Sequence, residues 1–128
     1  MAKRSRPSGS KPLGVGGSAV RRCVYVASPY SIGNQAANVR VQLDAAHRIL
    51  EMGHLPFAPL LNHLWHLTHP RSNKAWLDEY CLPWVERCDL LLRLPGTSPG
   101  ADLEVNHAIK HGIEPCFGWE DLEFTLEN

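Results

Sequence analysis

Short apolar segments alternate along this chain with longer segments in which apolar residues recur at helical spacing. Short apolar runs predict buried strands, whereas a spacing of three to four residues predicts amphipathic helices. The predicted strands cover residues 22–28, 54–59, 89–94 and 113–117. The predicted helices cover residues 36–52, 73–87, 101–111 and 121–126. This alternation indicates parallel strands joined by right-handed crossovers, and therefore a three-layer α/β sandwich with a sheet of four or five strands.

Two of the helical segments carry more detailed expectations. The first helix should bury an apolar face and end at Gly53 as its C-terminal cap, with the face formed by Val39, Leu43, Ala46, Ile49 and Leu50. The 73–87 helix should be capped by Ser72 or Asn73. Pro83 lies inside it and lacks an N–H donor, so we expect a kink or a split near Tyr80. Between these helices, residues 60–71 predict a helical turn followed by a loop.

Length and composition indicate a single globular domain. The 128 residues suit one hydrophobic core, and contents of 44% hydrophobic and 20% charged residues are ordinary for such a domain. No apolar run approaches the ~20 residues of a membrane-spanning helix. The sequence also shows no apolar core of a signal peptide. We therefore expect no membrane association.

Charge is distributed unevenly although the net charge is zero. Residues 1–22 hold six of the 13 Lys and Arg residues and no acidic residue, so the remainder is acidic. Residues 1–21, rich in Gly, Ser and Pro, predict a disordered basic tail, and residues 22–128 predict the domain. An acidic domain argues against general nucleic-acid binding, although the tail could contact nucleic acid or act as a targeting segment.

Cysteine and histidine spacing gives no metal-binding motif. Cys23, Cys81, Cys88 and Cys116 lack zinc-ribbon or redox spacing, and four unbridged thiols favour a reducing, cytoplasmic setting. His63, His66 and His69 recur every three residues, but Pro70 ends the helix and no Cys or carboxylate lies among them. We interpret these histidines as packing or pocket-wall residues, with Trp65 and Leu67. Trp76 and Trp84 are expected to anchor helices to the sheet or to a subunit interface.

Residues 89–104 carry the strongest chemical signal. A buried strand ends at Pro95, a loop of small residues follows, and Ser98 with Pro99 predicts a capped helix start. This geometry points backbone N–H groups and a helix N-terminus at an anion. Glu104 follows closely, where the helix dipole favours its ionised form, and Asp102 is interpreted as a charge that stabilises the helix N-terminus. The simpler alternative is a capped helix with a solvated Glu104.

A second polar loop, residues 29–35, follows the first predicted strand. Both loops leave the carboxyl ends of their strands, where ligands bind in open α/β sheets. The sequence therefore predicts that loops 29–35 and 95–100 converge on one site.

Several segments together resemble the nucleoside 2-deoxyribosyltransferase-like superfamily, which includes 2'-deoxynucleoside 5'-phosphate N-hydrolases. The resemblance spans residues 23–117, and its order and spacing are more specific than any single segment. The segments are Val24-Tyr25-Val26-Ala27-Ser28-Pro29-Tyr30, Trp84-Val85-Glu86-Arg87-Cys88-Asp89, Leu94-Pro95-Gly96, Ser98-x-Gly100-Ala101-x-x-Glu104, and Ala108 with Gly112.

The resemblance implies a flavodoxin-like or Rossmann-like fold that cleaves N-glycosidic bonds of a nucleoside or nucleotide without a metal or cofactor. It places the nucleophile at Glu104 and a neighbouring tyrosine at Tyr25. It implies that phosphate or sugar is bound at Ser98, Gly100 and Ala101. The base and sugar would be lined by Ser28, Pro29, Tyr30 and Ser31. The family also implies a homodimer or a higher homo-oligomer.

The chemistry is consistent with this assignment, but one position departs from the family pattern. Cleavage of a sugar–base bond builds oxocarbenium character, which a carboxylate can stabilise or trap, while the departing base needs a proton. Members of the resembled family usually carry an Asp eight residues before the position of Asp89, where this chain has Cys81. Asp78 lies one turn earlier and could partly substitute.

Three classes of function remain open from the sequence. The first is an N-glycosidase or deoxyribosyltransferase. The second is a nucleotide-binding or sensing module that has lost catalysis with the change at Cys81. The third is an unrelated α/β interaction domain. The sequence leaves open the base, the choice of ribose or deoxyribose, and hydrolysis or transfer.

Overall fold

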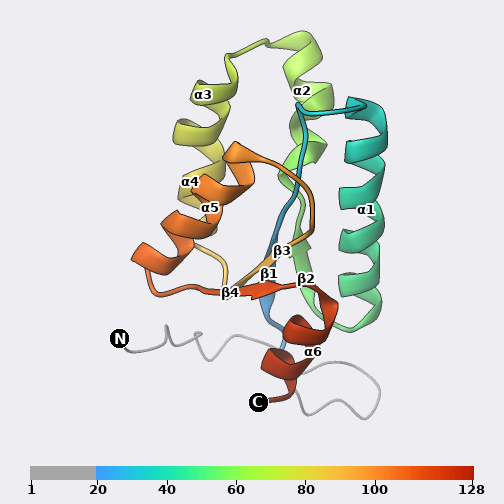
Figure 1. The fold of residues 1–128 in the computed structure, drawn as a ribbon, viewed down its shortest axis with the longest axis vertical. Coiled ribbons are helices and arrows are strands. Elements are labelled where there is room, and N and C mark those ends of the chain that lie inside the picture. The colour runs from blue at the N-terminus through green and yellow to red at the C-terminus, as the bar shows by residue number, and fades with distance from the viewer. Residues whose placement is uncertain (1–19) are drawn as a thin grey trace.

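The computed structural model describes residues 20–128, which form a mixed α/β domain (Figure 1). The predicted basic tail, residues 1–21, lies outside the described residues except for its last two. Four parallel strands form one sheet in the order β2-β1-β3-β4. The strands are β1 (Cys23–Ala27), β2 (Leu55–Phe57), β3 (Leu90–Arg93) and β4 (Glu114–Phe117). The predicted fold class is therefore confirmed, with four strands in the described part of the chain.

Helices cover both faces of this sheet because strand side chains alternate between two cores. Tyr25 and Leu91 point into one core, against α4 (Leu82–Val85) and α5 (Pro99–Lys110). Val24 and Leu90 point into the other, against α1 (Gln35–Glu51) and α6 (Trp119–Glu127). Figure 1 shows α1 on one side of the sheet, with α4 and α5 on the other. Within residues 20–128, no helix combines the length and apolar character needed to cross a membrane.

The buried face of α1 differs from the predicted face. Gln42, Ala45 and Ile49 are buried, whereas Leu50 is 49% exposed. Apolar character alone predicts the other face, but Gln42 occupies the core side because its amide nitrogen and oxygen are both hydrogen-bonded there. Asn34 caps this helix, accepting a hydrogen bond of 2.9 Å from the N–H of Ala37.

The segment after β2 contains more helix than predicted. A 3₁₀ turn, η1 (Pro59–Leu61), leads into α2 (Asn62–Thr68), so the predicted loop is confined to residues 69–72. The predicted 73–87 helix is divided into α3 (Asn73–Trp76), a π-helical turn η2 (Leu77–Cys81) and α4. This turn contains Tyr80, as predicted from the missing donor at Pro83.

None of the four cysteines, all within the described residues, forms a disulfide. Sequence spacing nevertheless missed one close pair. Cys23 begins β1 and Cys88 precedes β3, and their sulfur atoms lie 3.3 Å apart because these two strands are neighbours.

Candidate functional site

A pocket of about 540 Å³ opens at the carboxyl ends of β1 and β3. This is where the strand order reverses, because β1 pairs with β2 on one side and with β3 on the other. The loop after β1 contributes Ser28, Tyr30 and Ser31, and the start of α5 contributes Ser98 and Gly100. The two polar loops therefore converge on one site, as predicted. The volume suits a small-molecule ligand.

Glu104 and Tyr25 form a buried pair beside this pocket. Glu104 projects from α5 and is 7% exposed, and Tyr25 on β1 is fully buried. The Tyr25 hydroxyl donates a short hydrogen bond to Oε2 of Glu104. Glu104 lines the pocket, whereas Tyr25 lies behind it. The strand-to-helix packing thus brings together two residues that are 79 positions apart.

The protonation state of Glu104 differs from the expectation. Burial raises the pKa of Glu104 from 4.5 to about 8, although the Tyr25 hydrogen bond and the Arg93 charge act in the opposite direction. The expected preference of the helix dipole for ionised Glu104 is therefore opposed by desolvation, which favours the protonated carboxyl group. Burial, followed by the nearby Glu104 charge, also holds the pKa of Tyr25 well above its ordinary value.

Cys81 lies on the π-helical turn and is buried next to the same pair. Burial and the nearby Glu104 carboxyl raise the pKa of Cys81 to about 12, against the effect of a hydrogen bond with Tyr25. Its thiol is therefore neutral at physiological pH and cannot replace a carboxylate as a charge.

Asp78 also lines the pocket but has a different environment. Its side chain is 44% exposed, and Oδ2 lies 2.5 Å from the ammonium nitrogen of Lys74, four residues earlier. Lys74 lies on α3 and Asp78 on the π-helical turn, and both line the pocket. Asp78 is thus a solvated, ion-paired carboxylate within the site.

The start of α5 has the predicted cap. Ser98 Oγ accepts a hydrogen bond of 3.1 Å from the N–H of Ala101, and Pro99 occupies the first turn. Ser98 is buried but lines the pocket, so its hydroxyl hydrogen can still be donated to a ligand. Ala101 and Gly100 line the pocket beside it.

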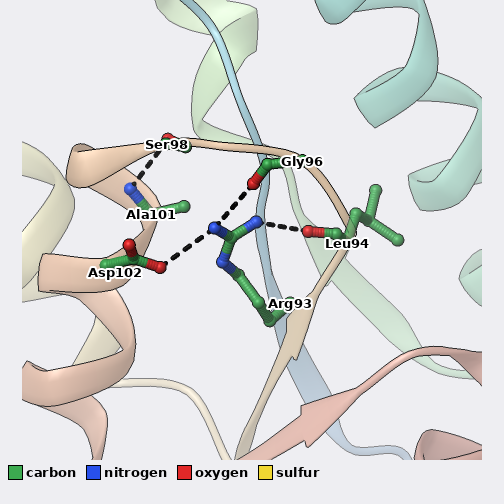
Figure 2. Close-up of polar contacts among 6 residues, drawn as sticks. All are labelled: Arg93, Leu94, Gly96, Ser98, Ala101 and Asp102. Atoms are coloured by element: carbon green, nitrogen blue, oxygen red, sulfur yellow. Dashed lines mark hydrogen bonds and ion pairs between the residues drawn. The ribbon is translucent and has the colours of Figure 1, made fainter.

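Arg93, which the sequence analysis missed, supports the loop between β3 and α5 (Figure 2). Its guanidinium donates to the carbonyls of Leu94 and Gly96 and pairs with Asp102 at 3.0 Å. Asp102 therefore has two roles. It lies in the first turn of α5, where the helix dipole favours a negative charge, and it forms an ion pair with Arg93. The sequence signal for this role is a basic residue, Arg93, at the end of a predicted buried strand and just before the Pro95-Gly96 turn.

Gln42 is a second site residue that the sequence pattern does not indicate. Its Nε2 donates to Ser28 Oγ at 2.8 Å and to the Val26 carbonyl at 3.2 Å. Its Oε1 accepts from the N–H of Leu60 at 2.8 Å. Gln42 therefore ties the loop after β1 to the segment after β2 and orients Ser28 at the pocket.

Pro29 occupies a different place from the other predicted site residues. It lies outside the pocket lining and packs against Gly96, which has φ of +118°. A Cβ at Gly96 would lie 2.8 Å from Pro29 Cγ, so the contact requires glycine there. Pro29 thus joins the two site loops, and its predicted contact with a ligand stays a prediction.

The three evenly spaced histidines have separate partners. Tyr30 Oη lies 2.7 Å from His63 Nδ1, and the Trp76 indole donates to His66 Nδ1 at 2.7 Å. His66 and the buried Trp76 line the pocket. His69 contacts Thr68 instead. These contacts agree with the interpretation of packing and pocket-wall residues.

Comparisons with known proteins add no assignment to this site. No protein-family model and no curated protein matches the sequence. The function therefore has to be inferred from the residues around the pocket.

Proposed function

We propose that this protein cleaves the N-glycosidic bond of a nucleoside or nucleoside 5'-monophosphate, by hydrolysis or transfer, as a member of the nucleoside 2-deoxyribosyltransferase-like superfamily. The observation that carries the proposal is the buried Tyr25–Glu104 hydrogen bond at the floor of a pocket formed by two strand ends. A carboxyl group held in this way is suited to act on one fixed atom of a ligand.

Glu104 is proposed as the nucleophile. Its ionised carboxylate attacks the anomeric carbon, the bond from that carbon to the base nitrogen breaks, and a glycosyl ester forms. Water, or a second base, then attacks the same carbon and releases Glu104. Because burial raises the pKa of Glu104 to about 8, its carboxyl group is mostly protonated at neutral pH. The positive charge that develops on the sugar favours the ionised form.

Phosphate binding is proposed at the start of α5. The Ser98 hydroxyl and the backbone at Gly100 line the pocket, and the helix N-terminus favours an anion. Lys74 also lines the pocket and supplies a positive charge there. Ser28, Tyr30 and Ser31, on the first loop, are then placed to contact the base or the sugar.

The departing base needs a proton, and the site offers two candidate groups. Asp78 is a carboxyl group within the pocket, but Lys74 is paired with it. Burial of the Cys81 thiol and its electrostatic interaction with the Glu104 carboxyl group raise its pKa. The thiol therefore carries no charge at neutral pH. We propose Asp78 as the acid and expect slow turnover.

A non-catalytic nucleotide-binding or sensing module is the second candidate. The raised pKa of Glu104 and the neutral thiol of Cys81 favour it, because both reduce the charge available for catalysis. Such a module would still use the anion site at Ser98 and Gly100.

We also propose that the protein is cytoplasmic and forms a homodimer or a higher homo-oligomer. Support for assembly comes from exposed leucines around α2, where Leu61, Leu64 and Leu67 are 62%, 71% and 65% exposed. Light scattering after size-exclusion chromatography tests this, and replacing Leu64 and Leu67 with Glu should favour the monomer.

The activity is tested by incubating the protein with ribo- and deoxyribonucleosides and their 5'-monophosphates, followed by chromatography for free base. Release of base by the natural protein, and its loss in Glu104→Gln, supports the enzyme. Saturable binding of a nucleotide without release of base supports the binding module. Failure of every ligand to bind or react contradicts both proposals.

A further inference from the structure

A second cluster of chemically active side chains lies outside the pocket, where the end of α4 meets the C-terminal part of α5. It consists of Glu86, His107 and His111, and none of the three lines the pocket. Their ligand atoms all lie within 4.8 Å of one another. Among the described residues, this is the group of three with metal-ligand geometry.

We propose that Glu86, His107 and His111 bind a divalent transition-metal ion such as Zn²⁺, which joins α4 to α5. Two histidines four residues apart on one helix and a carboxylate from a second helix form a ligand set that zinc uses, with a fourth position open to water. Imidazole nitrogen selects such a metal over Ca²⁺ or Mg²⁺, which prefer oxygen ligands.

The ligand atoms are already close to the required separation. Glu86 Oε2 lies 2.7 Å from His107 Nε2 and 3.7 Å from His111 Nε2. Metal–ligand bonds of about 2.0–2.1 Å in a tetrahedron place neighbouring ligand atoms about 3.3 Å apart. Small side-chain rotations therefore suffice to admit an ion between them. Binding replaces the direct Glu86–His107 contact with two bonds to the metal.

The surroundings also orient the histidines for metal binding. His111 Nδ1 lies 3.0 Å from the His107 carbonyl, and a hydrogen bond there directs the lone pair of Nε2 toward Glu86. A backbone carbonyl in this role is the usual support for a metal-bound histidine. The two rings lie 4.2 Å apart at their centroids. Glu86 and His111 are the C-terminal caps of α4 and α5, and helix C-termini favour a cation.

The location gives the ion a structural role. Cys81 lies on the π-helical turn that precedes α4 and Glu86. Glu104 lies on α5, one turn before His107. A metal that joins the ends of α4 and α5 therefore fixes two walls of the pocket relative to each other without touching the ligand. This inference rests on the three side chains alone and holds whether or not the pocket is catalytic.

The test is calorimetric titration of tag-free, chelator-treated protein with ZnCl₂. We expect one saturable site per chain and a rise in Tm of at least about 5 °C at a hundredfold excess of zinc over Kd. His107→Ala, His111→Ala and Glu86→Gln should each weaken binding at least about tenfold and remove most of the Tm rise. His47→Ala is the matched control, because His47 faces a single carboxylate, Glu51, at 3.4 Å.

A Co²⁺ spectrum separates this site from the cysteines. Nitrogen and oxygen ligation predicts visible absorption without an intense thiolate charge-transfer band. A strong thiolate band would overturn the proposal, as would unchanged zinc affinity in folded His111→Ala and Glu86→Gln. Absence of saturable zinc binding to the natural protein, with its fold checked by circular dichroism, would also overturn it. None of these results depends on nucleotide cleavage.

Discussion

The Tyr25 hydroxyl donates a hydrogen bond to the Glu104 carboxyl group inside the core between β1 and α5. Tyr25 keeps its own proton and does not transfer it to Glu104, because burial holds the pKa of Tyr25 well above its ordinary value. Burial of Glu104 raises its pKa and favours the protonated carboxyl group. The hydrogen bond lowers that pKa and favours the ionised carboxylate. Because these two effects oppose each other, the pKa of Glu104 should respond to the loss of a single hydrogen bond.

Replacement of Glu104 by Gln should reduce glycosidic turnover at least about 100-fold, because the variant keeps the volume but cannot stabilise or trap the oxocarbenium ion. Steady-state measurement of base release checks this. Glu114→Gln, a change at an exposed carboxyl on β4, is the control and should behave as the natural protein. Undiminished turnover in Glu104→Gln would rule out the proposed nucleophile.

The same substitution should stabilise the fold at higher pH. Glu104 has a pKa of about 8 when folded and 4.5 as its ordinary value, so the folded state binds more protons between these values. Stability of the natural protein therefore falls as pH rises from about 4.5 to 8, and Glu104→Gln removes that loss. We expect Glu104→Gln to gain on the order of 2–4 kcal/mol at pH 8 relative to pH 4.5. Urea unfolding at both pH values measures it, and a constant difference contradicts the burial argument.

Tyr25→Phe should shift the pH dependence of activity. The proposed reaction needs ionised Glu104, so kcat/KM of the natural enzyme should rise with a midpoint near pH 8. Loss of the Tyr25 hydrogen bond raises the pKa of Glu104 further, so the midpoint should move upward and neutral activity should fall about tenfold per pKa unit. Tyr80→Phe is the control, because Tyr80 packs nearby against Phe57. A midpoint that moves downward would show that Tyr25 does not favour ionised Glu104.

The alternating pattern of apolar runs and helical segments was enough to predict the sheet and its layers, because burial on two faces of a parallel sheet imposes that pattern. Ser98 and Pro99 were also predictable, since a helix start depends on adjacent residues. Gln42 and Arg93 were not, because their hydrogen bonds run to backbone groups whose positions depend on the fold.

The pKa of Glu104 shows a different limit. The helix dipole can be read from sequence, but the burial that outweighs it depends on the packing of α5 against β1. The same limit applies to Glu86, whose histidine partner His107 is 21 positions away.

Ser98→Ala should weaken binding of a 5'-monophosphate more than binding of its nucleoside. A charge-assisted hydrogen bond contributes about 1.5–3 kcal/mol, so we expect a loss of about tenfold or more for the nucleotide alone. Ser98→Ala also removes a helix cap, so Ser72→Ala is the control, because Ser72 caps α3 at 3.0 Å from the Ala75 nitrogen. Calorimetry measures both ligands. Equal losses for nucleotide and nucleoside would remove the phosphate from the proposed binding mode.

Cys81→Asp should raise turnover if the remaining site is intact. A new carboxyl group beside Glu104 is buried, and two carboxyl groups in one site cannot both ionise easily. One of them therefore keeps a proton at neutral pH and can donate it to the departing base, which the Cys81 thiol, with its pKa of about 12, does poorly. Cys81→Ser, which adds no acid, is the control and should leave turnover low.

Asp78→Ala separates this effect from the proposed role of Asp78. If Asp78 already supplies the proton, its removal abolishes turnover, and Lys74→Ala, which removes its ion-pair partner, should change turnover as well. Combining Asp78→Ala with Cys81→Asp then restores turnover, because the second carboxyl group replaces the first. If base release is rapid and unaffected by any of these changes, the proton comes from another group, and His66, which also lines the pocket, is the alternative.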